Sequence, residues 1–225
     1  MIQRFFACIV TVLLLLPFTN KVQAQQEPPF WKEIQAFKKQ DSLHFPPSNA
    51  ILFVGSSSFN YWKDVQDYFP GYTIINRGFG GSSLPHVITY ANDIIFPYHP
   101  RQVVIYCGEN DLNASDTVTA QVVFSRFSTL FNMIRKKLPK APIVFVSIKP
   151  SPSRARLMPE MVKSNDLIKA FLAKQRNTAF VDVYHSMLNA DGTPRKELFG
   201  PDMLHMNKQG YAIWQKAIQP HLLKD

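Results

Sequence analysis

The chain has 225 residues, of which 46% are hydrophobic and 18% are charged. This length and composition fit one globular domain with a sizeable core, and they exclude an intrinsically disordered or fibrous chain. The formal net charge is +9, but Lys and Arg occur in short scattered clusters that we interpret as solvated helix faces. Because no basic segment is interleaved with aromatic residues, we expect no nucleic-acid partner.

Residues 1–24 have the pattern of a secretory signal peptide. Arg4 gives a basic start, residues 9–16 form an apolar run, and Val22-Gln23-Ala24 is a small-residue cleavage pattern. We therefore predict cleavage after Ala24 and export to the periplasm or the medium. The alternative is a retained N-terminal membrane anchor, although the apolar run is short for a span of about 20 residues. We expect no membrane span in the mature chain.

Cleavage would also remove one of the two cysteines, Cys8, and leave Cys107. No internal disulfide could then form, so the exported protein would depend on its hydrophobic core for stability. Cys107 follows an apolar run and is interpreted as a buried strand residue. Loss of Arg4 and Lys21, the charged residues of the signal, would lower the formal net charge from +9 to +7.

Residues 25–49 are predicted to form a linker and a helix over 30–40, and residues 50–225 to form one domain. The predicted strands cover 50–54, 72–76, 102–107, 142–147 and 179–183. The predicted helices cover 61–69, 84–96, 115–138, 159–174 and 207–222. Strands that alternate with helices of this length pair in parallel through right-handed crossovers. We therefore predict a three-layer α/β/α domain with a five-stranded sheet.

Four short motifs carry the candidate chemistry, and they follow predicted strands or precede the last helix. They are Gly55-Ser56-Ser57-Ser58, Asn76-Arg77-Gly78-Phe79-Gly80-Gly81-Ser82, Gly108-Glu109-Asn110-Asp111 and Asp202-Met203-Leu204-His205. Each alone has a structural explanation, such as a turn, a phosphate cradle or a helix cap. In open α/β sheets, however, ligands bind at the carboxyl ends of the strands, so four such motifs in this order favour a functional site.

These residue types fit a serine hydrolase. A serine hydroxyl is a poor nucleophile until a neighbouring imidazole accepts its proton. The imidazole in turn needs a carboxylate that fixes its tautomer and stabilises the imidazolium. Backbone N–H groups and an asparagine amide can stabilise the oxyanion. On the residues alone, Ser56, Ser57 and Ser58 are all candidates for the nucleophile.

The four motifs resemble, in order, the four sequence blocks of SGNH hydrolases, the GDSL-type esterases and acylhydrolases. The resemblance covers roughly residues 50–222. It implies a flavodoxin-like parallel sheet and a serine esterase that forms an acyl-enzyme. It also implies a catalytic triad and an oxyanion hole: Ser57, Asp202 and His205 for the first, and Ser57, Gly81 and Asn110 for the second.

One position departs from that family's pattern. The family usually has an aspartate between the glycine and the nucleophilic serine, and this chain has Ser56 there. The change alters hydrogen bonding in the turn but removes no member of the triad.

Other polar residues near the motifs have less defined interpretations. Arg154 and Arg156 follow a proline-rich stretch predicted at the same edge of the sheet, and they either reach an anionic substrate group or belong to a surface loop. His86 lies close to the Gly80-Gly81 turn. Apart from His205, no histidine, His86 included, has metal-ligand spacing with a second His, Cys or acid, so we expect neither a metal nor an organic cofactor.

The sequence therefore predicts an exported serine esterase that removes acetyl or other short acyl groups from carbohydrates. One alternative is a lysophospholipase-like lipid acylhydrolase, and another is a non-catalytic glycan-binding module on the same fold. A more distant alternative is a metal-dependent hydrolase built on Asp111, Asp202 and His205. Four aromatic residues near the nucleophile could form a sugar platform, an acyl pocket or simply core: Phe59, Tyr61, Trp62 and Phe79.

Overall fold

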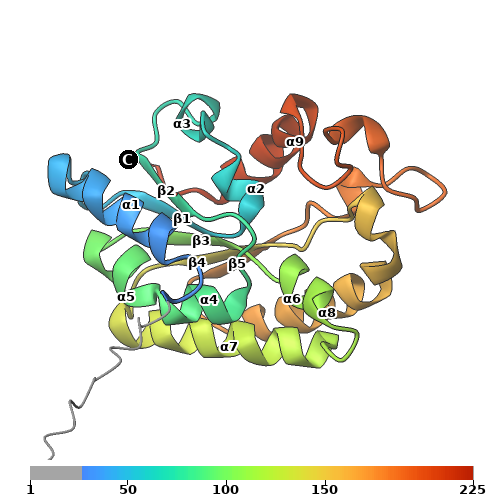
Figure 1. Ribbon diagram of the computed structural model, residues 1–225, viewed down its shortest axis with the longest axis horizontal. Helices are drawn as coiled ribbons and strands as arrows, with labels where there is room; N and C mark the ends of the chain where they lie inside the picture. Colours follow the sequence, from blue (N-terminus) through green and yellow to red (C-terminus); the bar gives the residue numbers. More distant parts are fainter. Residues whose placement is uncertain (1–26, 225) are drawn as a thin grey trace, which may run out of the picture.

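The computed structural model describes residues 27–224 and contains a five-stranded parallel sheet with strand order β2-β1-β3-β4-β5. Helices cover both faces of this sheet (Figure 1). The strands are β1 (Ile51–Gly55), β2 (Ile74–Gly78), β3 (Gln102–Tyr106), β4 (Ile143–Val146) and β5 (Thr178–Val181). The predicted three-layer α/β/α fold with a five-stranded parallel sheet is therefore confirmed.

The helices differ more from prediction than the strands do. The α-helices are α1 (Trp31–Leu43), α2 (Ser57–Asn60), α3 (Val65–Tyr68), α4 (Leu84–Thr89), α5 (Ala91–Ile94), α6 (Glu109–Ala114), α7 (Ala120–Lys137), α8 (Met158–Leu172) and α9 (Lys208–Ile218). The 3₁₀ turns are η1 (Phe96–Tyr98), η2 (Pro152–Leu157), η3 (His185–Met187), η4 (Lys196–Leu198) and η5 (Gln219–His221).

Three predicted helices were wrong in extent. Of the helix predicted over 61–69, only α3 forms, and the separate turn of helix α2 precedes it. The Asn76 amide donates to the Phe59 carbonyl at 2.7 Å, in the last turn of α2. The helix predicted over 84–96 is divided into α4, α5 and η1 by the non-helical backbone of Tyr90 and of Ile95. The helix predicted over 115–138 begins at Ala120, after the separate helix α6.

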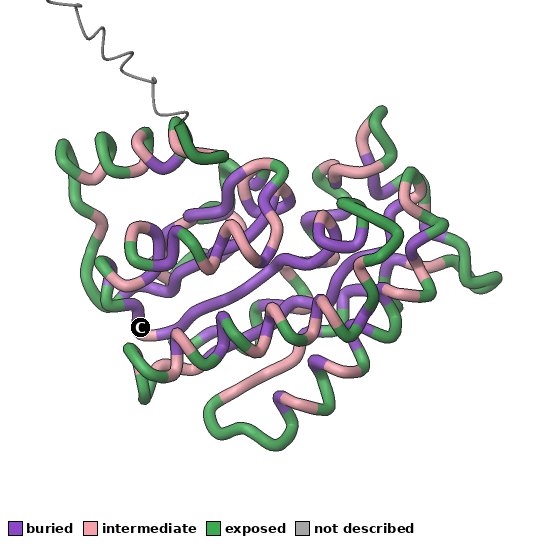
Figure 2. The backbone as a smooth tube through the Cα atoms, turned by 60° about the horizontal axis from the view of Figure 1, so that its bottom comes forward, coloured by how far each residue is buried: buried purple, intermediate pink, exposed green. Residues whose placement is uncertain are grey.

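The sheet separates two hydrophobic cores. Its residues alternate between the faces, as the pleat of a strand requires. One face packs on α4, α5, α7 and α8, and its strand residues include Leu52, Val54, Val103, Ile105 and Phe145. The other face packs on α2, α3 and α9, and its strand residues include Ile51, Phe53, Val104, Tyr106 and Val144. Figure 2 shows the resulting buried strands in the middle of the molecule.

The strand order places two motifs at the point where the connections change direction. From β1 the chain crosses to β2 on one side, whereas β3 lies on the other side of β1. Ligand sites of open α/β sheets lie at such switch points, beyond the carboxyl ends of the strands. Ser57 opens α2 directly after β1, and Asn110 lies in α6 directly after β3. The fold therefore brings the first and third motifs to one place (Figure 1).

Further observations concern the N-terminal segment, membrane-spanning helices and the cysteine at the end of β3. The predicted signal peptide, residues 1–24, lies outside the described residues. Within residues 27–224, no helix has the length and apolar character needed to cross a bilayer. Cys107 is buried, as expected of a residue at the end of a strand.

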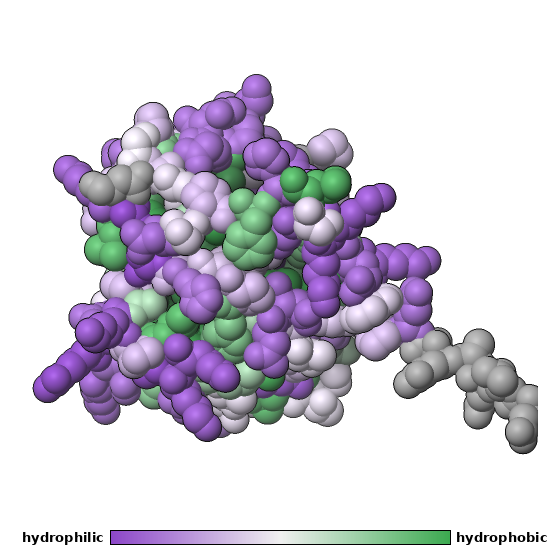
Figure 3. All heavy atoms as spheres, turned by 90° about the vertical axis from the view of Figure 1, so that its left-hand side faces the viewer, coloured by the Kyte–Doolittle hydropathy of each residue, from purple (hydrophilic) through white to green (hydrophobic). Residues whose placement is uncertain are grey.

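The face at the left of Figure 1 carries mostly hydrophilic residues with small, separate hydrophobic areas (Figure 3).

Candidate active site

A tight turn after β1 sets the position of Ser57. Gly55 has a φ of +137°, and a Cβ atom there would lie 1.9 Å from the carbonyl oxygen of Tyr106. Only glycine allows this approach of β1 to β3. The next residue, Ser56, is extended, and its N–H donates to the same Tyr106 carbonyl at 2.9 Å. Ser57 then begins α2 at the end of the sheet.

Three side chains from distant parts of the chain form a continuous polar chain. The Ser57 Oγ lies 2.9 Å from Nε2 of His205, and Nδ1 of the same ring lies 2.5 Å from Oδ2 of Asp202. The second carboxylate oxygen, Oδ1, accepts the backbone N–H groups of Leu204 and His205, both at 3.0 Å. These contacts hold the imidazole between a hydroxyl and a carboxylate, as acid–base transfer from the serine requires.

The environment of Asp202 keeps its carboxylate charged. Burial raises the pKa of Asp202, but hydrogen bonds from the His205 backbone, the His205 ring and the Leu204 backbone outweigh it. The net result lowers the pKa of Asp202 from 3.8 to about 2. The carboxylate is therefore ionised at neutral pH and can stabilise a protonated imidazole.

The hydroxyls of the two other candidate nucleophiles, Ser56 and Ser58, are buried in the same turn. Ser56 is 2% exposed and Ser58 is 1% exposed, so both are buried in the turn. The Ser56 Oγ accepts a hydrogen bond from the Asn110 amide at 2.7 Å. Of these three serines, Ser57 is the one whose hydroxyl contacts His205.

The second and third motifs are linked to the turn by hydrogen bonds. The single hydrogen of the Ser82 hydroxyl is shared between the carbonyls of Gly55 and Phe79, both at 3.0 Å. The Asn110 Nδ2 group donates to the Ser82 carbonyl at 2.9 Å as well as to Ser56. Gly81, with a φ of +76°, immediately precedes Ser82 in this loop. The structure thus brings Asn110 and the Gly81 loop to the turn that carries Ser57.

Glu109, next to Asn110, is the centre of a buried polar network that sequence reasoning missed. Its carboxylate accepts from Lys149 Nζ at 2.6 Å, from the Tyr106 hydroxyl at 2.8 Å, and from the Ser151 hydroxyl. Burial raises the pKa of Glu109, but the charges of Lys149 and Arg154 outweigh it and leave the pKa below its ordinary value. The proline-rich loop after β4 was predicted at this edge, but no sequence pattern indicated that its lysine pairs with Glu109.

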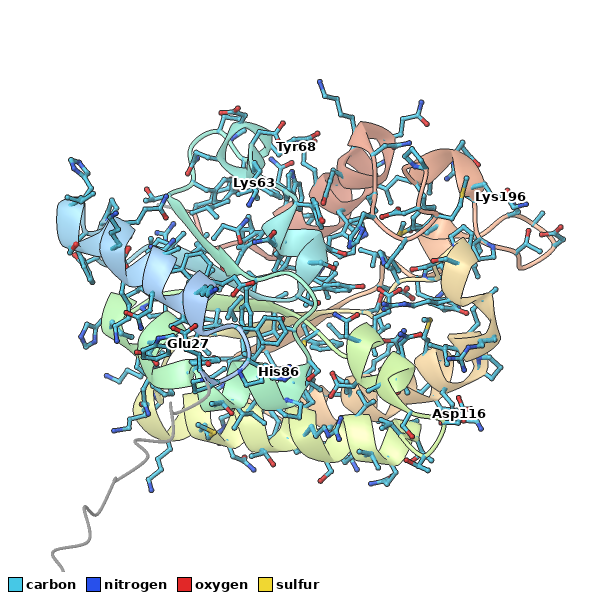
Figure 4. The ribbon with its side chains drawn as sticks, viewed as in Figure 1. Glu27, Lys63, Tyr68, His86, Asp116 and Lys196 are labelled. Carbon is cyan, nitrogen blue, oxygen red and sulfur yellow. The ribbon has the colours of Figure 1, made fainter. Side chains whose placement is uncertain are left out.

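Asp111 and His86, which the sequence placed near the site, make hydrogen bonds within the protein framework. Asp111 is fully buried and accepts the Leu84 N–H at 2.9 Å and the Arg126 guanidinium at 2.8 Å. His86, on α4 (Figure 4), accepts the Ser83 N–H at its Nδ1 at 3.1 Å, which is a helix-cap contact. Within residues 27–224, no group of three His, Cys, Asp or Glu side chains is placed to hold a metal ion.

The four aromatic residues near the nucleophile divide into two groups. Phe59, Trp62 and Phe79 are fully buried and belong to the cores. Tyr61 is 56% exposed, and its ring centroid lies 4.4 Å from that of His205. Tyr61 is therefore the member of the four that borders the triad with an exposed aromatic ring.

The two arginines predicted near the site also differ. Arg154 donates to the side-chain carbonyl oxygen of Asn110, Oδ1, at 2.9 Å and is largely buried. Arg156 is exposed and pairs with Asp116 at 2.9 Å. The sequence placed both near the site but did not indicate that Arg154 contacts the predicted oxyanion donor.

Comparison with known proteins identifies the family. Residues 52–213 match the GDSL-like lipase/acylhydrolase family. The chain belongs to this family. The resemblance predicted from the four motifs is therefore confirmed, and membership in the GDSL-like family supports an ester hydrolase.

The individual proteins that this chain resembles are distant in sequence but align with it over most of its length. The rat platelet-activating factor acetylhydrolase IB subunit alpha1 is 25% identical over 183 residues, covering 77% of this chain and 75% of its own. A GDSL-like lipase from Bacteroides thetaiotaomicron superposes with a TM-score of 0.69 at 21% identity, covering 83% of this chain and 95% of its own. An acetylxylan esterase from Geobacillus stearothermophilus superposes with a TM-score of 0.62 at 15% identity, covering 80% and 96%.

Proposed function

We propose that this chain is an exported serine esterase whose triad is Ser57, His205 and Asp202. The observation that carries the proposal is the continuous contact from the Ser57 hydroxyl through both nitrogens of His205 to the Asp202 carboxylate. Three residues separated by up to 148 positions have no structural need to meet in this order. This arrangement makes a serine nucleophilic by giving its proton an acceptor.

The reaction begins when the Ser57 Oγ attacks the ester carbonyl carbon and His205 Nε2 takes the hydroxyl proton. Backbone N–H groups of Ser57 and Gly81 stabilise the oxyanion of the tetrahedral intermediate, together with the Asn110 N–H that donates to the Ser56 hydroxyl in the absence of substrate. When the carbon–oxygen bond to the alcohol breaks, His205 returns the proton to the leaving alkoxide. Water then attacks the acyl-enzyme, loses its proton to His205, and releases the acid while Ser57 regains its proton.

The proposed substrates are carbohydrates that carry acetyl or other short acyl groups. The exposed ring of Tyr61 beside His205 supports this choice, since an aromatic face next to the triad can stack on a sugar ring. The names of two relatives from different sources, an acetylhydrolase and an acetylxylan esterase, share the acetyl group and support a short acyl chain.

A second candidate substrate is an acetylated or lyso phospholipid. The observation that favours it is the name of the rat relative, a platelet-activating factor acetylhydrolase subunit. Met203, which lies between Asp202 and His205 in the chain and is 37% exposed, adds apolar surface beside the triad. The two candidates share the chemistry of the triad and differ in the alcohol.

A substrate panel tests these proposals. Wild type and Ser57→Ala are compared on acetylated oligosaccharides, an acetylated phospholipid, and p-nitrophenyl esters of increasing chain length. The proposal expects turnover of acetylated sugars and short esters, with a loss of several orders of magnitude in Ser57→Ala. Turnover of the phospholipid with none on sugars would favour the second candidate. Equal rates for wild type and Ser57→Ala would contradict the triad, and no turnover of any ester would favour a glycan-binding module.

Export is tested separately. Residues 1–24 carry the signal-peptide pattern, so the protein recovered from the periplasm or the medium should begin at Gln25. Mass spectrometry of the intact protein gives this N-terminus directly. Recovery of the full-length chain in the membrane fraction would instead support the N-terminal anchor.

A further inference from the structure

Arg154 contacts the side chain that is proposed to stabilise the oxyanion. It lies in η2, in the loop that follows β4, and its guanidinium donates to Asn110 Oδ1 at 2.9 Å. Its side chain is 15% exposed, so this contact is largely shielded from water. A hydrogen bond from a charged donor in such a place is stronger than a neutral one on the surface.

The other end of the Asn110 amide is fixed as well. An asparagine NH₂ group has two hydrogens, and here it donates to the Ser82 carbonyl at 2.9 Å and to the Ser56 hydroxyl at 2.7 Å. Rotation of the amide by 180° would place its oxygen against the Ser82 carbonyl and its NH₂ group against the Arg154 guanidinium. Both contacts would then be repulsive, so Arg154 and Ser82 together determine which atom faces the turn that carries Ser57.

Arg154 is itself held in place from two sides. Its guanidinium lies 3.7 Å from the Glu109 carboxylate, which also accepts from Lys149. Its backbone N–H donates to the Ser151 carbonyl at 2.9 Å, and the preceding Ser153 N–H donates to the Met203 carbonyl at 3.0 Å. The second of these bonds connects the loop of Arg154 to the loop that carries Asp202 and His205. The guanidinium therefore has a defined position relative to both parts of the site.

We propose that Arg154 is a positioning residue that orients and polarises the Asn110 amide, rather than a binder of anionic substrate groups. This inference rests on the proposed esterase function, because it assigns Asn110 to the oxyanion. A cation at the amide oxygen draws electron density from the nitrogen and makes its N–H groups better donors. The effect is greatest when negative charge develops on the substrate oxygen, so it acts on turnover more than on binding.

A double-mutant cycle tests whether Arg154 acts through Asn110. Wild type, Arg154→Ala, Asn110→Ala and the double variant are compared on p-nitrophenyl acetate, an uncharged ester. Arg154→Ala should lower kcat by about 10–100-fold with little change in KM, less than the about 10²–10³-fold expected of Asn110→Ala. In the Asn110→Ala background, the same change should cost less than about threefold, because its partner is gone.

The matched control is Arg156→Ala, which removes an equal charge from the same turn. Arg156 pairs with Asp116, labelled in Figure 4, on the exposed surface. We expect its kcat to stay close to wild type. Arg154→Lys and Arg154→Gln are measured too, so that a folding defect of the alanine variant leaves the test intact. We expect kcat to fall in the order Arg, Lys, Gln.

Two results would overturn the inference. One is an unchanged kcat in Arg154→Ala or Arg154→Gln. The other is an equal loss from the Arg154 change in the wild-type and the Asn110→Ala backgrounds, which would show that Arg154 acts elsewhere. Neither result touches the proposed function, which is judged separately by whether wild type turns over the ester and whether Ser57→Ala, measured beside it, loses that activity.

Discussion

Asp202 shows how single hydrogen bonds at the site affect both catalysis and stability. Its carboxylate accepts two backbone N–H groups and contacts the His205 ring. These bonds exist only in the folded chain, and they lower its pKa from 3.8 to about 2. A carboxylate whose pKa is depressed by folding adds stability at pH values above its unfolded pKa, and this stability disappears as the pH falls toward the folded pKa.

We therefore expect the stability difference between wild type and Asp202→Asn to depend on pH. Wild type should have the higher Tm near pH 6, and its advantage should shrink as the pH falls from about 4 to about 2. Asparagine can still accept the two backbone N–H groups, so the comparison reports the loss of the charge together with the loss of the Oδ2 acceptor that contacts His205 Nδ1. Thermal unfolding followed by circular dichroism gives both Tm values, and a difference that stays constant over this range would contradict the assignment.

The oxyanion assignment gives a second prediction for a single residue. Asn110→Ala should lower kcat by about 10²–10³-fold, since one preorganised donor is lost while the triad is retained. The Tm should change much less than the rate, because Asn110 lies at the start of α6 and is not part of either core. Steady-state kinetics and thermal unfolding on the same preparation check this. A rate near wild type would remove Asn110 from the oxyanion hole.

Among the contacts between secondary-structure elements, the close approach of β1 to β3 at Gly55 sets the position of the turn that carries Ser57. Gly55 ends β1 where the Tyr106 carbonyl of β3 leaves no space for a side chain. Gly55→Ala should therefore cost about 4 kcal/mol or more in the free energy of unfolding, since the strands must separate. Gly192→Ala is the control, because Gly192 also has a positive φ, +81°, but no atom lies within 4 Å of its Cβ position.

The control should lose only about 1–2 kcal/mol, the cost of left-handed backbone for alanine. Urea unfolding of the two variants gives the comparison. Equal losses would mean that backbone strain, rather than the approach of β3, determines the choice of glycine at Gly55.

The buried pair of Lys149 and Glu109 joins the loop after β4 to α6. Lys149→Met should cost about 3–5 kcal/mol, because it leaves the Glu109 carboxylate buried with a weaker set of partners. Adding Glu109→Gln should recover much of this loss, since the uncompensated charge is then removed. Urea unfolding of the single and double variants checks this, and a double variant less stable than Lys149→Met would contradict it.

The order of the elements could be predicted from the sequence more fully than their contacts. Apolar runs such as 51–54 have strand length and are followed by turn residues, so their place in a buried parallel sheet was predictable. The helix at Ser57 was not, because its length is a single turn and no apolar repeat marks it. Helix limits such as the break at Tyr90 depend on backbone and side-chain contacts that only the folded chain contains.

The candidate site shows the same division between motifs and contacts. The four motifs predicted which residues meet at the switch point, because each follows a strand or precedes the last helix. They did not predict that Arg154 contacts Asn110, since hydrogen-bond partners 44 positions apart leave no local pattern. The sequence also did not predict which aromatic side chains are exposed. Tyr61 and Trp62 are adjacent aromatic residues, yet Tyr61 borders His205 and Trp62 lies in the core.

The functional loops of the molecule gather at the carboxyl-terminal end of the parallel strands. The strand order β2-β1-β3-β4-β5 sends the chain outward in both directions from β1, so the loops after β1, β2 and β3 meet there. The loop after β4 and the loop before α9 are joined at the site by the hydrogen bond from the Ser153 N–H to the Met203 carbonyl. One hydrophobic core packs on each face of the sheet, and together they fix the strand ends from which these loops start.

The most direct test is to identify the residue that reacts with a fluorophosphonate probe. Such probes bind covalently to a serine only when a neighbouring base activates it. We predict a single adduct on Ser57, located by mass spectrometry of the peptide that contains it, and no adduct in His205→Ala. An adduct on Ser56 or Ser58, or equal labelling without His205, would contradict the proposed triad.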